Sequence, residues 1–276
     1  MTDSVKRNII DGKNDDPKGN RLERFADIHS HCLPGLDDGP STRAESLALC
    51  QMLVADGTAT AVATPHQLGR FEDCNEATSV REAVWDLNES LKNNTVPLKV
   101  VPGGEVRVDE RICQLLEADK ILTLADGGRF ILLELPYRVF IEIEPLLTEL
   151  ASMGIKPIIS HAERITPLAA QPRVLLRWLE HSTHLQITAS SLLGDSGPEV
   201  QKIAWGLLAS GFATLVATDS HDIYFRKPRM RAAFGRITTE LGKDIAHLVC
   251  IENPSRVING QDIHPISICD EQKVNR

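Results

Sequence analysis

Histidine and aspartate side chains lie close together near the start of this 276-residue sequence. His29 and His31 are two residues apart, so both imidazoles point to the same side of an extended chain. Asp37 and Asp38 follow directly before Gly39, where we expect the chain to turn. Two imidazoles beside a carboxylate suit Mn, Fe or Zn better than Ca or Mg. The pair alone could equally be two surface histidines in a loop.

Arginines follow two other histidines and indicate the class of substrate. Arg164 comes three residues after His161, and Arg226 comes five residues after His221, beside Lys227. A guanidinium group binds phosphate through two parallel hydrogen bonds, so both arginines are candidates for phosphate binding. The competing interpretation for each arginine is a surface salt bridge.

The elements that must position these side chains alternate along the chain. Short apolar stretches alternate with helical ones, which is typical of parallel strands joined by crossover helices. Seven such strands in one chain predict an α/β barrel slightly short of the usual eight strands. The first expected strand begins at Phe25. The other six are Thr60–Thr64, Leu98–Val101, Arg129–Leu133, Lys156–Ser160, Leu185–Thr188 and Ala213–Thr218.

Potential metal ligands follow six of these seven strands. They are His29, His31, Asp38, His66, Glu105, Glu134, His161, Asp219 and His221. In a parallel barrel the carboxyl ends of the strands share one face, where active sites lie. A core histidine would explain one such residue, but not the whole set. Nine ligands fit two or three bridged ions, which can activate water and bind phosphoryl oxygens.

Composition limits the alternatives. A formal net charge of −8 argues against binding of long nucleic acids as the main activity. None of the six cysteines forms Cys-x-x-Cys, so we expect reduced thiols in a cytoplasmic protein. No apolar run is long enough for membrane insertion. Residues 1–24 are expected to be a flexible N-terminal extension, residues 25–262 the barrel, and residues 263–276 a tail.

The ordered set of motifs resembles the PHP (polymerase and histidinol phosphatase) superfamily. It is most similar to the bacterial manganese-dependent protein-tyrosine phosphatases of capsule and exopolysaccharide gene clusters. Order, spacing and residue type agree from about Arg24 to Gly260. The matching segments are Asp27–His31, Leu33–Gly39, Ala63–His66, Gly104–Arg107, Ser160–Arg164, Thr188–Gly194, Ala217–His221 and Ile251–Pro254.

The resemblance implies a PHP fold, a distorted seven-stranded (β/α)7 TIM-like barrel with three divalent ions, Mn first and Fe, Zn or Mg as alternatives. By position, the ligand sets would be His29, His31, Glu105 and Asp219; then Glu105, Glu134 and His161; then Asp38, His66 and His221. Asp38 is preferred to Asp37, a choice that the sequence leaves open. Arg164 and Arg226 match the phosphate-binding arginines of these phosphatases.

The resemblance also implies the reaction and the partner. The chain would hydrolyse phosphotyrosine on a protein, expected to be an autophosphorylated bacterial tyrosine kinase that controls polysaccharide synthesis or export. The sequence does not indicate an oligomeric state.

Three alternatives stay open from the sequence. One is another phosphoesterase of the superfamily, such as a histidinol phosphatase acting on a small molecule, or a nuclease. Another is a module that only stores metal. The third is cysteine-based chemistry, because Cys250 and Arg256 fit the Cys-x5-Arg signature of cysteine phosphatases. Against that chemistry, Glu252 would repel phosphate and Pro254 lacks an N–H donor.

Overall fold

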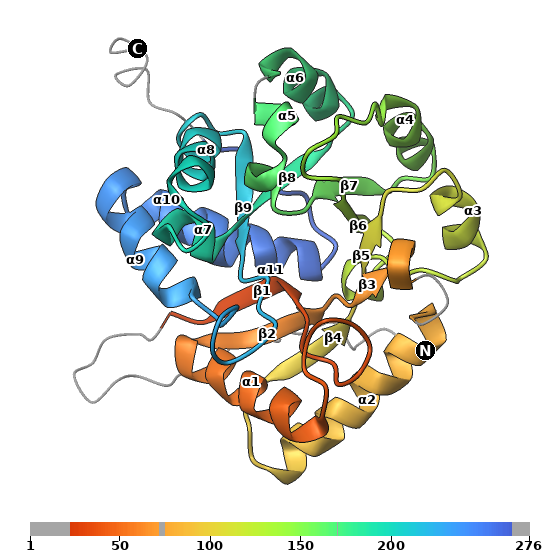
Figure 1. Ribbon diagram of the computed structural model, residues 1–276, viewed down its shortest axis with the longest axis vertical. Helices are drawn as coiled ribbons and strands as arrows, with labels where there is room; N and C mark the ends of the chain where they lie inside the picture. The colour runs from red at the N-terminus through yellow and green to blue at the C-terminus, as the bar shows by residue number, and fades with distance from the viewer. Residues whose placement is uncertain (1–22, 72–74, 170, 267–276) are drawn as a thin grey trace, which may run out of the picture.

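Short parallel strands lie at the centre of the molecule and helices surround them (Figure 1). The computed structural model describes residues 23–71, 75–169 and 171–266. All pairings between the strands of this part are parallel, as the alternation predicted. The strands are β1 (Phe25–Ser30), β2 (Thr58–Ala63), β3 (His66–Gln67), β4 (Lys99–Pro102), β5 (Glu105–Arg107), β6 (Phe130–Glu134), β7 (Lys156–Ile159), β8 (His184–Thr188) and β9 (Ala213–Ala217).

The predicted count of seven strands is wrong, because the described residues contain nine in two sheets. One sheet has the order β1-β2-β4 and the other β3-β5-β6-β7-β8-β9. The two additional strands come directly after predicted ones: β3 follows Thr60–Thr64 beyond Pro65, and β5 follows Leu98–Val101 beyond Gly103 and Gly104. Proline lacks an N–H for the ladder and glycine weakens a strand. A parallel α/β fold is therefore confirmed, whereas one closed barrel is not.

Main-chain hydrogen bonds connect the two sheets beside β1. The His31 N–H donates to the carbonyl of Ser220 at 2.8 Å, and the Asp219 N–H donates to the carbonyl of His29 at 2.8 Å. The segment after β9 is thereby held against the end of β1. This contact places chemically important residues from the two ends of the chain next to each other.

The helices follow the strands as expected, and their ends match the local sequence signals. Thr42 and Glu45 form the predicted capping box of α1, and Gly57 ends that helix with a φ of 106°. The helices are α1 (Arg43–Asp56), α2 (Ala77–Asn93), α3 (Ile112–Glu117), α4 (Glu144–Ser152), α5 (Thr166–Ala169), α6 (Pro172–Glu180), α7 (Ala189–Leu193), α8 (Pro198–Ala209), α9 (Met230–Leu241), α10 (Lys243–His247) and α11 (Asn253–Ile258). No helix among the described residues is long and apolar enough to cross a membrane.

The core consists of apolar side chains between the strands and the surrounding helices. Leu132 of β6, Ile158 of β7 and Leu215 of β9, all in the larger sheet, are completely buried in one cluster. Their burial holds the strand ends in fixed positions.

Several predictions concern residues outside the described ranges. Only residues 23 and 24 of the expected extension, and residues 263–266 of the expected tail, are described. Among the cysteines, Cys74 and Cys269 also lie outside. The four described cysteines are free and buried: Cys32, Cys50, Cys113 and Cys250.

Candidate metal centre

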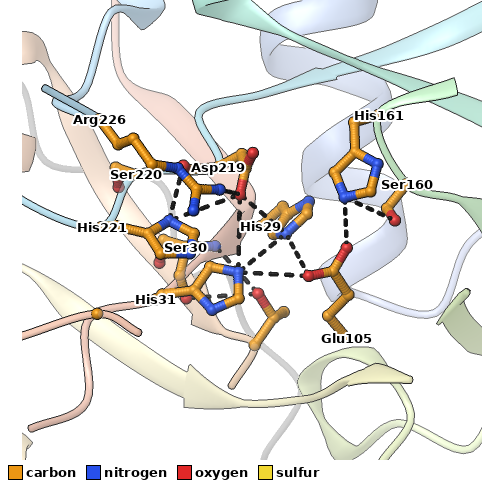
Figure 2. A network of polar contacts seen from close by, with 12 residues as sticks. His29, Ser30, His31, Glu105, Ser160, His161, Asp219, Ser220, His221 and Arg226 are labelled. Atoms are coloured by element: carbon orange, nitrogen blue, oxygen red, sulfur yellow. Dashed lines mark hydrogen bonds and ion pairs between the residues drawn. The ribbon is translucent and has the colours of Figure 1, made fainter. Parts of the chain in front are cut away.

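Two imidazoles and two carboxylates converge where β1 and β9 end and β5 begins (Figure 2). The Nε2 atoms of His29 and His31 are 3.2 Å apart. Oε2 of Glu105 is 3.3 Å from His29 Nε2 and 3.5 Å from His31 Nε2. Oδ1 of Asp219 is 3.4 and 3.7 Å from the same two nitrogens. Four electron-rich atoms from three separate segments thus surround one point.

The hydrogen bonds of the Nδ1 atoms of His29 and His31 show why the point between their Nε2 atoms suits a cation. His29 Nδ1 lies 3.0 Å from Oε1 of Gln186, and His31 Nδ1 lies 2.6 Å from Oδ2 of Asp37. Each Nδ1 therefore donates a proton, which leaves Nε2 available as a ligand. Both carboxylate oxygens of Glu105 are buried without a well-formed hydrogen bond. Such acceptors, packed this closely, fit a divalent ion that they bind together.

A second group of ligands lies beside the first. Oδ1 of Asp38 is 3.3 Å from Nε2 of His66 and 3.2 Å from Nε2 of His221. Together with His31, these residues form a group that could hold a metal ion. Asp37 has another role, because it accepts hydrogen bonds from His31 and from the backbone N–H of His66. The geometry therefore favours Asp38 over Asp37 as a ligand.

The remaining predicted ligands lie at the border of the centre. His161 Nε2 is 2.8 Å from Oε1 of Glu105. Oε2 of Glu134 is 3.8 Å from Nδ1 of His66, and its Oε1 is 3.2 Å from Arg107. Glu134 is thus partly neutralised by an arginine that the sequence analysis did not single out.

The backbone is unusual at three positions that shape the centre. His161 and Asp219 adopt positive φ angles of 32° and 52°. Such conformations cost about 1–3 kcal/mol and are concentrated at functional sites. A Cβ atom at Gly39 would lie 2.5 Å from the carbonyl oxygen of His31, so only glycine lets this turn approach the strand end.

The two predicted arginines bind opposite oxygens of one carboxylate. Arg164 donates to Oδ2 of Asp219 and Arg226 donates to Oδ1, each at 2.8 Å. Burial alone would raise the pKa of Asp219, but His29 and the two guanidinium groups hold it well below its usual value. Asp219 therefore stays ionised, and it joins the metal centre to both arginines.

Two buried histidines of the centre, His29 and His31, show the same preference for positive charge. Burial alone would lower the pKa of His31, but the Asp37 carboxylate raises it to about 10. Burial also opposes ionisation of His29, yet Glu105 and Asp219 raise its pKa. A proton and a metal ion compete for such nitrogens, so metal binding here should release protons.

A cavity of about 420 Å³ opens onto the centre. Its described lining consists of Asp38, His66, Leu68, Gly69, Arg70, Phe71, Glu105, Arg107, Glu134, Tyr137, His161 and Arg226. This size and this mixture of charged and aromatic side chains are suited to a small polar group carrying an apolar one.

Sequence comparison places this site in a known family. The family model described as "Capsular polysaccharide synthesis, CpsB/CapC" matches residues 25–259. The chain belongs to the CpsB/CapC family. It is 32% identical over 238 residues to the tyrosine-protein phosphatase YwqE of Bacillus subtilis, which covers 86% of this chain and 92% of the relative.

Further relatives agree with this assignment to the CpsB/CapC family. The chain is 28% identical over 242 residues to the tyrosine-protein phosphatase CpsB of Streptococcus pneumoniae, covering 85% of this chain and 98% of the relative. The fold of this chain matches a crystal structure from a set of structures of YwqE of Bacillus subtilis and CpsB of Streptococcus pneumoniae, described as "unique metal-dependent tyrosine phosphatases". The TM-score is 0.82 and the sequence identity is 31%. That match covers 87% of this chain and 96% of the other. The resemblance inferred from the motifs is thereby confirmed.

Sequence reasoning missed a glutamine that orients two histidines of this CpsB/CapC-family chain. Oε1 of Gln186, within β8, lies 3.0 Å from Nδ1 of His29 and accepts the backbone N–H of His161 at 3.1 Å. The side chain is completely buried. A single amide between apolar neighbours in an expected strand was the signal that could have revealed it.

Substituting Gln186 with leucine should weaken metal binding. The variant keeps a similar volume but loses the acceptor for His29 Nδ1, so Nε2 is no longer held as a ligand. We expect the affinity for Mn²⁺ to fall by roughly 10–100-fold, as for other groups that orient metal ligands. Calorimetric titration measures this change, and Gln201→Leu, at a glutamine of α8 whose amide donates to the carbonyl of Leu192, is the matched control. Equal affinities in Gln186→Leu and the wild type would disprove this role.

Proposed function

We propose that this chain is a metal-dependent protein-tyrosine phosphatase, a phosphoric monoester hydrolase. The observation that carries the proposal is the convergence of His29, His31, Glu105 and Asp219 on one point, with two arginines bound to Asp219. The names of the relatives YwqE and CpsB support phosphotyrosine as the reacting group.

We propose three divalent ions, with Mn²⁺ as the metal, held by side chains of this chain. The ligand sets would be His29, His31, Glu105 and Asp219; Glu105, Glu134 and His161; and Asp38, His66 and His221, which His31 also approaches. When bound, such ions lower the pKa of water and neutralise phosphoryl oxygens. The buried oxygens of Glu105 and Nε2 of His221, which make no well-formed hydrogen bond, fit this role.

The arginines would bind the phosphate itself. Arg164 and Arg226 each donate a hydrogen bond to Asp219, and a guanidinium group carries five N–H donors, so further donors are available for phosphoryl oxygens. Their charge stabilises negative charge that develops in the transition state. The leaving group, a phenol with a pKa of about 10, needs less protonation than an alkyl alcohol.

Cysteine-based hydrolysis is not supported by the surroundings of Cys250. Its thiol is completely buried, within the π-helical turn Leu248–Glu252. Burial raises the pKa of this thiol far above its usual value, so no thiolate is available as a nucleophile. The match to Cys-x5-Arg is therefore a coincidence of sequence.

We also propose the protein substrate, its location, the bounds of the catalytic domain and the way the two sheets combine. The substrate would be an autophosphorylated tyrosine kinase in the cytoplasm that controls polysaccharide production, in keeping with the family description. Residues 25–262 would form the catalytic domain. The two sheets would form one interrupted barrel, because backbone hydrogen bonds join the end of β1 to the segment after β9 and Glu105 to Pro65.

Turnover of three phosphate esters by the Mn²⁺-loaded full chain tests the function. We expect release of phosphate from a phosphotyrosine peptide at a higher kcat/KM than from histidinol phosphate, and no cleavage of a short oligonucleotide. A preference for histidinol phosphate would favour the small-molecule alternative. Bound Mn²⁺ without turnover of any ester would indicate a metal-storing module instead.

A further inference from the structure

The cavity at the metal centre has an uneven lining. Most of its described lining residues are charged or histidine, as expected for a site that takes phosphate. Its apolar side chains come from two segments: Leu68 and Phe71 follow β3, and Tyr137 follows β6. Tyr137 remains 40% exposed, and Phe71 is partly exposed. Partly exposed aromatic rings beside a polar pocket indicate contact with an apolar part of a ligand.

The two aromatic rings pack on two different histidines of the centre. The Phe71 ring is nearly parallel to His66, with an interplanar angle of 5° and ring centres 5.4 Å apart. The Tyr137 ring packs edge-on against His161, at 76° and 5.2 Å. Arg70 lies 4.6 Å from the centre of the Phe71 ring and fixes it further.

Glu105 lies between His66 and His161 and faces each of them with a different oxygen. Its Oε2 faces Nδ1 of His66 at 3.1 Å, whereas its Oε1 faces Nε2 of His161 at 2.8 Å. The rings of Phe71 and Tyr137 thus border the cavity from two sides. In Figure 2, His161 and Glu105 are seen beside the cluster formed by His29 and His31.

The geometry of phosphoryl transfer indicates which part of the substrate would lie between the rings of Phe71 and Tyr137. The attacking and leaving oxygens are roughly in line with phosphorus. A phosphate bound at the ligands and the arginines therefore directs its leaving group outwards, into the cavity mouth. There the organic part of the ester meets the aromatic side chains.

We propose that Phe71 and Tyr137 form an aryl-binding subsite that makes the centre selective for aryl over alkyl phosphate monoesters. The inference rests on the phosphatase function proposed above and names two residues that would determine its preference for the tyrosyl ring. The hydroxyl of Tyr137 lies beside the guanidinium group of Arg164, one of the two arginines proposed to bind the phosphate.

Binding of two phosphonates to the Mn²⁺-loaded full chain tests the subsite. Benzylphosphonate carries a ring and methylphosphonate does not, and calorimetry gives both Kd values without any turnover. For Phe71→Ala and Tyr137→Ala we expect the Kd of benzylphosphonate to rise roughly three- to tenfold, the usual value of an aromatic pair. The Kd of methylphosphonate should not change. Tyr137→Phe, which keeps the ring, should bind both probes as the wild type does.

Phe225→Ala is the matched control, because Phe225 is 91% exposed and lies outside the described cavity lining. It should change neither Kd. Equal losses for both phosphonates would show that Phe71 and Tyr137 only support the histidines, and would overturn the proposal. Unchanged binding of benzylphosphonate to Phe71→Ala and Tyr137→Ala would overturn it too. Failure of the proposed function appears separately, as absent phosphotyrosine turnover by the wild type.

Discussion

Glu105→Gln should reduce phosphotyrosine turnover by roughly 10³-fold, because the metal ions of such a centre supply several kcal/mol of transition-state stabilisation. Oε2 of Glu105 faces His29, His31 and His66, and Oε1 faces His161, so this carboxylate takes part in more contacts than a single ligand set requires. An amide has the same shape but lacks the negative charge that the proposed cations would need from this position. Steady-state kinetics with a phosphotyrosine peptide and elemental analysis of bound Mn measure the effect.

The control for Glu105→Gln is Glu252→Gln. Glu252 also pairs with a histidine, His264, at 2.9 Å, but both side chains are substantially exposed. This variant should keep wild-type kinetics. In thermal unfolding, Mn²⁺ should raise the midpoint of the wild type and of Glu252→Gln, but barely that of Glu105→Gln. Wild-type activity and metal content in Glu105→Gln would contradict the assignment of this residue.

Arg164→Met should lower kcat/KM by roughly 10²–10³-fold, the usual cost of removing one donor that stabilises transition-state charge. The guanidinium group is mostly buried and bound to Asp219 at 2.8 Å, so its position is well defined. Arg164→Lys should recover only part of the activity, because an ammonium group keeps the charge but not the planar pair of donors.

The metal content of Arg164→Met distinguishes a role of this arginine in stabilising the transition state from a role in holding the metal centre together. Loss of Arg164 leaves more negative charge on the Asp219 side, so Mn²⁺ binding should persist while inorganic phosphate inhibits less strongly. Arg236→Met, which removes an exposed arginine paired with Glu240 on α9, should change neither property. If Arg164→Met kept its kcat/KM, the arginine would serve only as a partner of Asp219.

The convergence of the site could be anticipated from the sequence for a simple physical reason. Parallel strands end on the same side, so polar residues such as Glu105 and Asp219 that follow apolar strands must approach each other. Both are buried in the structure although 114 positions separate them. The capping box at Thr42 is equally predictable, because its hydrogen bonds depend only on neighbouring residues.

Other features depend on contacts that a sequence does not reveal. The division into two sheets arises where the chain bends at Pro65 and at Gly103, and a continuous barrel would satisfy the same pattern. Gln186 resembles any polar residue on a strand until His29 is placed beside it. Asp37 and Asp38 have the same chemistry and adjacent positions, and only the turn at Gly39 directs one toward His31 and the other toward His66.

The central claim is that side chains from distant segments hold metal ions that hydrolyse phosphotyrosine. The most direct test is turnover of a phosphotyrosine peptide by the full chain after removal of metal with a chelator, before and after Mn²⁺ is restored. We predict a negligible rate in the metal-free protein and recovery as Mn²⁺ is added. Full activity in chelator, with elemental analysis confirming that no metal remains, would contradict this account.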